Sequence, residues 1–237
     1  MGKVFTSEDY IKLKEANNGS TDLVIPEGYD EIGAEAFYIS DITAIEIPST
    51  VREIGAYAFA YCCRLRQVKF VEGSVLEEIG DCAFANCLQL RQVSFAEDSK
   101  LEEIGTRVFY NAALTEISLP SSLKRINSFT FDDSNLEKVI FGKDAIIEYD
   151  DNGKIRKLTI HTRNKELARL LIYENDSCED LVIKYDNYQL LDEFIQQLNG
   201  RVVFFNRVTL IGEKLSIRQK SHIKRNLRKL LEIWKLE

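Results

Sequence analysis

The stretch AIEIPSTVREIGAYAFAYC, residues 44–62, is dense in residues of the kind that fill protein cores. These residues follow neither the 3.6-residue period of a helix nor the two-residue period of one long strand. They are Ile45, Ile47, Val51, Ile54, Ala58 and Phe59. A run without either period is explained if it is one copy of a repeat, whose core forms only when successive copies stack.

The same landmarks recur along the chain at spacings of 22 to 25 residues. Copies of an isoleucine-glycine pair begin at Ile32, Ile54, Ile79 and Ile104, with Ile126-Asn127 as a degenerate fifth. A phenylalanine follows five residues later, at Phe37, Phe59, Phe84, Phe109 and Phe131. The pattern L-x-x-V-x-F reads as Ile42-Ile45-Ile47, Leu65-Val68-Phe70, Leu90-Val93-Phe95, Leu114-Ile117-Leu119 and Leu136-Val139-Phe141. Insertions fall between the landmarks, as expected for a true repeat.

Each V-x-F segment predicts a short strand. Side chains alternate along a strand, so Val68 and Phe70 would point one way and Lys69 the other. Three residues cannot bury a face alone, but the coils of a solenoid would stack such strands about 4.8 Å apart in a parallel ladder. The repeated isoleucines and phenylalanines would then form the opposite wall of each coil. We therefore expect the phenylalanines to lie above one another in one continuous core.

The residue pattern of the repeat resembles that of a known family. The consensus E-I-x-x-I-G-x-x-A-F-x-x-C-x-x-L-x-x-V-x-F, with Ile47-Pro48 and Leu119-Pro120 ending two strands, closely resembles the BspA-like class of leucine-rich repeats. Departures from that consensus are Val108, Asn111, Asn127 and Ser134. The resemblance covers residues 22–142 and implies an α/β fold, a right-handed leucine-rich repeat solenoid with a parallel β ladder. It also implies an adhesion or protein-binding module of bacteria and some protists, with no catalytic residue attached.

In such repeats the outward side chains of the ladder form the concave face. Two outward columns follow from the alignment. The first is Asp22, Ala44, Gln67, Gln92, Glu116, Lys138, Lys157 and Asp180. The second is Val24, Glu46, Lys69, Ser94, Ser118, Ile140, Thr159 and Val182. From them we predict a partner-binding surface of Glu46, Gln67, Lys69, Gln92, Ser94, Glu116, Ser118, Lys138 and Lys157, the alternative being a sheet face that is merely soluble.

We expect one continuous domain in three parts. Residues 1–21 would hold an N-terminal cap helix, with Thr6 and Asp9 placed for a capping box. Residues 22–142 would form the repeats, and residues 143–237 divergent repeats with longer helices and a C-terminal cap helix.

Beyond residue 142 the strand spacing continues while the helical pattern grows. Ile155-Leu158-Ile160 and Cys178-Leu181-Ile183 repeat the spacing of the earlier strands, so each would be a further rung of the ladder. Residues of helical periodicity lie at about 164–173 and 187–198. A further strand at 202–205 or 208–211 would extend the ladder.

The last segment, residues 216–236, predicts one helix, with Ser216 and Gln219 placed for a capping box. Its apolar stripe would be Ile223, Leu227, Leu230, Leu231 and Trp234, and its basic face Arg218, Lys220, Lys224, Arg225, Arg228 and Lys229. Residues 201–237 carry a charge of +7, whereas the first 200 carry −14. A basic helix of this kind meets nucleic acid, an anionic membrane surface or an acidic protein, or is simply a solvated cap.

The five cysteines and two histidines do not favour a metal or catalytic site. Cys62 and Cys87 occupy one repeat position and would stack as buried free thiols, although a disulfide between them is an alternative in an oxidising compartment. Zinc would need four ligands at suitable spacing. The sequence has no glycine-rich phosphate loop and no G-x-S-x-G motif, so we predict neither an enzyme nor a cofactor.

Two functions therefore stand as hypotheses. The first is a non-catalytic protein-binding module that uses the ladder face, and the second is an intracellular factor that binds nucleic acid or an acidic partner through the basic helix. No apolar run reaches the length of a membrane span. If Met1 is the native start, the missing secretory core predicts a cytoplasmic protein; if a signal was removed, the resemblance predicts the cell surface.

Overall fold

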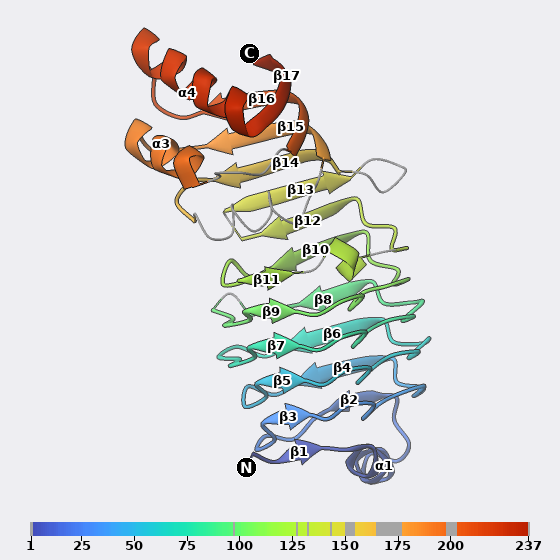
Figure 1. Cartoon of the computed structure of the whole chain (residues 1–237). Helices are drawn as coiled ribbons and strands as arrows, with labels where there is room; N and C mark the ends of the chain where they lie inside the picture. The colour runs from blue at the N-terminus through green and yellow to red at the C-terminus, as the bar shows by residue number, and fades with distance from the viewer. Residues whose placement is uncertain are drawn as a thin grey trace. The chain divides into compact units, whose positions relative to one another are not determined.

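The computed structural model describes residues 2–96, 98–126, 128–131, 133–142, 144–149, 155–164, 177–197 and 203–236. The chain forms two compact units, Met1–Leu136 and Glu137–Glu237 (Figure 1).

The first unit is a stack of coils with two ladders. One ladder is a parallel sheet of β1 (Val4–Phe5), β3 (Glu31–Ile32), β5 (Glu53–Ile54), β7 (Glu78–Ile79), β9 (Glu103–Ile104) and β11 (Arg125–Ile126). The other is a parallel sheet of β2 (Asp22–Val24), β4 (Ala44–Ile47), β6 (Gln67–Phe70) and β8 (Gln92–Ser94). β10 (Glu116–Leu119) contacts β8, and a short 3-10 helix, η1, spans Ser128–Phe131. The predicted ladder is thus confirmed, and the isoleucine of each Ile-Gly pair lies in the first sheet.

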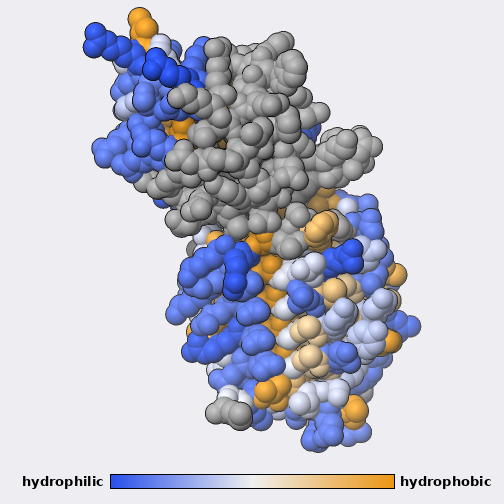
Figure 2. Space-filling view, in the orientation of Figure 1, coloured by the Kyte–Doolittle hydropathy of each residue, from blue (hydrophilic) through white to orange (hydrophobic). Residues whose placement is uncertain are grey.

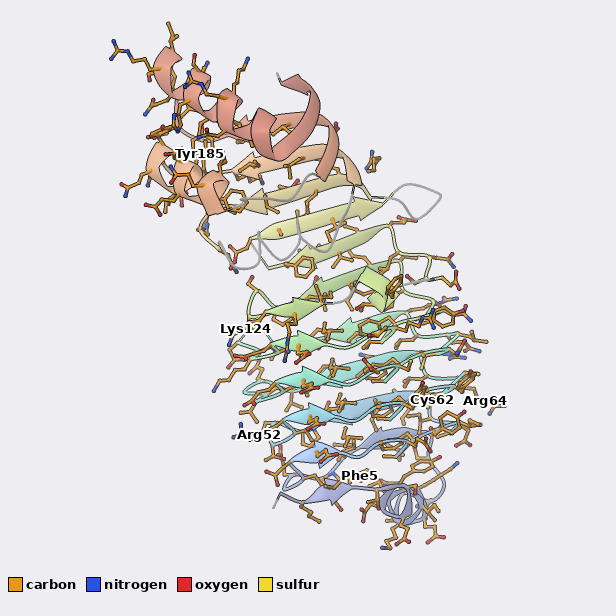
Figure 3. All side chains as sticks on the ribbon, viewed as in Figure 1. Phe5, Arg52, Cys62, Arg64, Lys124 and Tyr185 are labelled. Carbon is orange, nitrogen blue, oxygen red and sulfur yellow. The ribbon has the colours of Figure 1, made fainter. Side chains whose placement is uncertain are left out.

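The core of the first unit consists of columns of equivalent side chains. Ring centroids of successive repeat phenylalanines lie 4.7 to 5.8 Å apart and their planes are within 12° of parallel, from Phe37 to Phe131. Phe5 of β1 adds a sixth ring to this column, stacked 5.2 Å from Phe37. The predicted stacking of the phenylalanines is confirmed, and Figure 3 shows Phe5 on the first rung.

The glycine of the Ile-Gly pair is explained by the close approach of successive coils. A Cβ on Gly55 would lie 2.6 Å from the backbone nitrogen of Ala34, and one on Gly80 would lie 2.9 Å from that of Ala56. Any side chain at these positions would therefore push one coil away from the next.

An N-terminal helix covers the start of the stack, as predicted. α1 spans Ser7–Ala16, and its N-cap Thr6 forms the predicted capping box with Asp9. The Tyr10 ring lies 5.0 Å from the Phe37 ring, so the helix packs against the first coil of the stack.

The second unit is a mixed sheet with helices. Its strands, in spatial order, are β12 (Lys138–Phe141), β13 (Ala145–Tyr149), β14 (Ile155–His161), β15 (Ser177–Lys184), β16 (Val203–Ile211) and β17 (Leu231–Leu236). The helices are α3 (Tyr188–Gln197) and α4 (Ile217–Leu230). β12, β13 and β14 pair antiparallel, whereas β14 to β17 pair parallel. Leu191, Phe194 and Ile195 of α3 and Ile223 and Leu227 of α4 are buried.

Two predictions for this unit were wrong. The strand at Ile155 does not follow β12 as the next parallel rung, because the intervening β13 pairs antiparallel with both β12 and β14. Gly142, with a φ of 51°, makes the turn after β12, and Ala145 and Ile147 bury their alternate side chains as a strand. The C-terminal helix ends at Leu230 instead of continuing to 236, since residues 231–236 pair in parallel with β16 as β17.

Other predictions for this unit have three outcomes: some are confirmed, two predicted strands are one strand, and some fall on residues that are not described. A helix at 188–197 and the capping contacts between Ser216 and Gln219 are present. The two alternative strands at 202–205 and 208–211 are parts of one strand, β16. The helix predicted at about 164–173 lies almost wholly outside the described residues, and so does the side chain of Cys178.

Candidate protein-interaction face

The outward side chains of four strands of the first unit form a surface that we call the ladder face. It consists of Ala44, Glu46, Gln67, Lys69, Gln92, Ser94, Glu116 and Ser118. All eight are exposed or half-buried, whereas the residues that alternate with them, such as Ile45 and Val68, are buried. Two faces of one strand thus separate packing from solvent contact.

The register of the strands holds the ladder face in rows. Glu46 lies opposite Lys69, which lies opposite Ser94, and Gln67 lies opposite Gln92. The predicted columns are therefore adjacent from β2 to β8. Parallel strands in register place these side chains at regular intervals over a close-packed core, which is a rigid arrangement for recognition.

Charge is largely balanced at one end of the ladder face. The Lys69 Nζ lies 2.8 Å from Glu46 Oε2, and the Lys69 side chain is 53% exposed. A pair this open to solvent adds little stability, at most about 1 kcal/mol, so a partner can displace it. Beyond this pair, the Gln92 amide donates to Ser94 Oγ over 3.2 Å, and the centre of the face is polar and uncharged.

Lys138 and Lys157, which were predicted to continue the same columns, belong to the second unit. They lie on β12 and β14, with Glu148 of β13 in register between them. The sequence missed this intervening rung because β13 carries no L-x-x-V-x-F pattern.

The second predicted column also changes character in the second unit. Thr159 and Val182, expected to face solvent, are each only 8% exposed. They therefore pack within this unit, and the prediction that they point freely outward was wrong. The reason lies in the fold, since both faces of the sheet in the second unit bury side chains at these positions.

The basic face predicted for the C-terminal helix lies on α4, and Figure 2 shows strongly hydrophilic side chains gathered over this helix. Arg218, Lys220, Lys224 and Arg225 are exposed, opposite the buried Ile223 and Leu227. Arg228 and Lys229 fall on the helix, but their side chains lie outside the described part. Among the described side chains, the acid that contacts α4 is Asp192, which lies 3.1 Å from His222.

Sequence reasoning missed an exposed apolar surface on the first unit, which we call the aromatic edge. It consists of Tyr38, Ile39, Tyr57, Tyr61 and Leu88, each at least 42% exposed. The Tyr38 and Tyr61 rings meet edge to face at 5.6 Å. Figure 3 shows Cys62 and Arg64, the neighbours of Tyr61, on the flank opposite Arg52 and Lys124. The available signal was the presence of apolar residues at the variable positions around the A-F pair of the repeat.

The repeat cysteines form the predicted buried thiols. Cys62 and Cys87 are free and fully buried, and their Sγ atoms donate to the carbonyls of Phe37 and Phe59. Burial raises the pKa of the Cys62 thiol to about 11 and that of Cys87 well above its usual range. These thiols are therefore packing residues, and the described residues include no group of three or more His, Cys, Asp or Glu that could hold a metal ion.

Comparison with protein families shows which family the repeats belong to. Residues 30–152 match the model of the BspA type leucine rich repeat region, in six copies. The chain belongs to this family. The resemblance seen in the Ile-Gly and A-F residues is therefore confirmed, and the matched residues include the strands of both ladders of the first unit from β3 onward. Members of this family are typically protein-interaction or surface proteins and are generally not enzymes.

Solved structures that this BspA-type chain is similar to are bacterial leucine-rich repeat proteins. One from T. pallidum is 25% identical, with 92% of this chain and 86% of that one covered, at a TM-score of 0.47. One from Bacteroides ovatus is 19% identical, with 82% and 54% covered, at a TM-score of 0.45. A leucine rich cell surface protein from Faecalibacterium prausnitzii is 14% identical, with 84% and 89% covered, at a TM-score of 0.26. Curated proteins gave no match. Among the described helices, none has the length and apolar character to cross a membrane.

Proposed function

We propose that the first unit is a non-catalytic protein-binding module whose ladder face contacts a partner chain. The observation that supports this proposal is the register of exposed side chains, most of them polar, from β4 to β8 over a core of stacked columns. Such a surface is preorganised, so a partner that binds it does not have to order it first. Side chains that point into solvent are also free to vary without disturbing the core.

The chemistry of the ladder face indicates the kind of contact it would make. Its centre offers the amides of Gln67 and Gln92 and the hydroxyls of Ser94 and Ser118, which donate and accept hydrogen bonds. Only one ion pair, Glu46 with Lys69, lies in the described rows from β4 to β8. We therefore expect a polar interface whose affinity changes little with salt.

A capture experiment with matched variants tests this proposal. Purified protein with Lys69, Ser94 and Ser118 all changed to Trp is compared with the native protein, using both cytoplasmic and surface fractions of the source cell. Bulky rings on these exposed positions should leave folding intact and block the face. The control carries Trp at Glu31, Glu53 and Glu78, which lie on the other ladder of the same unit.

We expect the ladder-face variant to capture at least about tenfold less of one protein than the native chain does. The control should capture the same amount of that protein as the native chain. A further variant, Tyr38→Ser with Tyr61→Ser, asks whether the aromatic edge joins the same interface. Equal capture by native protein and ladder-face variant would overturn the proposal, as would equal loss in the control.

A second candidate function rests on a different observation. The exposed basic side chains of α4 face solvent without a described acid beside them, so this helix could bind nucleic acid or an acidic partner through charge. Binding of this kind falls steeply with salt, because counterions are released. The test is to measure binding of double-stranded DNA and RNA from 50 to 200 mM salt, with Arg218→Glu and Arg225→Glu as the variant. Binding that ignores salt or survives the variant rules this function out.

A further inference from the structure

The second unit contains an open pocket of about 310 Å³, two of whose lining residues, Lys220 and Lys224, also belong to the basic face of α4. It is lined by the end of β15, the end of β16, the following loop and α4. Its volume is at the lower end of the range for ligand sites in proteins, so it would suit a small molecule. Figure 3 labels one of its residues, Tyr185, beside the helices of this unit.

The floor of the pocket is apolar and held in place. Ile223 of α4 and Leu215 of the loop are buried, and Leu210 of β16 lines the same space. The Tyr185 hydroxyl donates to the carbonyl of Glu213 over 2.7 Å and so fixes the loop against the end of β15. The site is therefore a shaped depression and not a gap between loose side chains.

The rim of the pocket is cationic. Lys214, Lys220 and Lys224 line it, and all three are exposed. Lys220 and Lys224 are four residues apart on α4, so their side chains lie on the same side of the helix. No ion pair joins any of the three to an acid among the described side chains. Three like charges around one opening repel one another, and an anion bound between them would relieve that repulsion.

The one acid of the lining is engaged elsewhere. Glu213 accepts a hydrogen bond at Oε1 from the backbone nitrogen of Tyr188, at the start of α3, over 2.5 Å. A carboxylate at the N-terminus of a helix is well placed electrostatically, so Glu213 has a partner of its own. The lysines thus keep a net positive charge at the mouth of the pocket.

We propose that this pocket binds a small amphiphilic anion, with a carboxylate or phosphate head at the lysines and a short aliphatic tail on the floor of Leu210, Leu215 and Ile223. Lysine is a point charge that accepts either head group, whereas the apolar floor requires the tail. The site is independent of the ladder face, and its ligand is a small molecule, not a protein or a nucleic acid.

The test is to titrate the full chain with four probes. Binding is monitored through the amide signals of Gly212 to Leu215 in NMR spectra. Hexanoate and hexyl phosphate carry both parts of the ligand, whereas acetate lacks the tail and 1-hexanol lacks the charge. We expect saturable binding of at least one of the first two with a Kd of about 1 mM. Acetate should be at least tenfold weaker, because each buried methylene adds up to about fourfold. The tighter of hexanoate and hexyl phosphate identifies the head group.

A pair of matched variants separates the pocket from the general charge of the helix. Lys220→Gln with Lys224→Gln should raise the Kd about tenfold, whereas Arg225→Gln, which removes a charge from α4 outside the pocket lining, should change it less than about twofold. All three residues are exposed, so the fold should persist, and circular dichroism checks this. The proposal is overturned if neither amphiphile saturates, if 1-hexanol binds as well as the tighter of the two amphiphiles, or if Arg225→Gln matches the double variant.

Discussion

The two units bury their apolar side chains in different ways. In the first unit one residue type fills the same place in every coil, so Phe84 rests between Phe59 and Phe109 and the glycines allow the coils to approach. In the second unit the strands still align similar residues, with Leu158 opposite Leu181 and Ile160 opposite Ile183, but part of the buried core comes from helices, as with Phe194 of α3. A column makes each coil depend on its neighbours, whereas a helix packed on a sheet depends on local fit. The following predictions test that dependence.

The largest effect is expected in the phenylalanine column. Phe84→Ala should lower the free energy of unfolding by about 3 to 5 kcal/mol, because a fully buried ring is replaced by a cavity. Urea unfolding measures the change. The double variant of Phe59 and Phe84 should be non-additive by about 0.5 to 3 kcal/mol, since the rings touch. The double variant of Phe37 and Phe109, which are not neighbours in the column, should be additive within about 0.5 kcal/mol; equal coupling in both pairs would argue against columns.

Adding a side chain where successive coils touch should have the next largest effect. Gly55→Ala should destabilise the protein by about 1 to 3 kcal/mol, because its Cβ would press on the backbone at Ala34. Gly73→Asn is the control, since nothing lies within 4 Å of that position and Asn tolerates its φ of 71°. Thermal unfolding compares the two, and an unchanged midpoint for Gly55→Ala would show that the coils are not in close contact.

A turn of the first coil carries a residue that the later coils avoid. Ile39 has a φ of 59°, a left-handed conformation that is unfavourable for a β-branched residue, while Asn86 and Asn111 hold the same place two and three coils on. Ile39→Asn should therefore stabilise the protein by about 1 kcal/mol. The reverse exchange, Asn86→Ile, should destabilise by at least as much, as read by urea unfolding. A loss of stability with Ile39→Asn would mean that its exposed side chain has a packing role.

The smallest effect concerns the acidic column of the other ladder. Burial, and then the nearby carboxylates of Glu103 and Glu53, raise the pKa of Glu78. A raised pKa means that the folded protein binds this proton more tightly than the unfolded chain, so stability is lost as the pH rises through the folded value. Glu78→Gln should thus stabilise by about 0.3 kcal/mol at pH 7, with the gain vanishing below pH 4.

Glu77→Gln is the matched control for this effect. It removes the 2.7 Å contact with Arg52 and should destabilise slightly at pH 7. Unfolding curves at pH 7 and pH 4 separate the two variants. If both variants change the free energy of unfolding in the same direction at pH 7, the glutamates of this column do not repel one another measurably.

The sequence predicted the first unit well because its columns repeat. Ile54, Phe59 and Val68 could be assigned to a core from the sequence alone, since equivalent residues recur at the same spacing. The outward positions of the ladder face followed from alternation in the same strands. The aromatic edge was missed because its residues vary from coil to coil, so no period marks Tyr61 or Leu88 as exposed.

The second unit was predicted less well, for physical reasons. The antiparallel β13 depends on a turn at Gly142 and on pairing with two strands, neither of which leaves a repeat in the sequence. Leu231 and Trp234, three residues apart, fit a helical stripe, and only the pairing of this segment with β16 makes it a strand. The pocket gathers Tyr185, Lys214 and Lys224 from separate elements, and no local pattern connects residues so far apart in the sequence.

The central claim is that equivalent residues of successive repeats stack in register and so leave the ladder face free for recognition. The most direct test is to measure nuclear Overhauser contacts between phenylalanine rings in selectively labelled protein. The structure predicts contacts of Phe84 with both Phe59 and Phe109, whose centroids lie 5.0 and 5.7 Å away, and none between Phe59 and Phe109. Contacts between Phe59 and Phe109, or none from Phe84 to either ring, would contradict it.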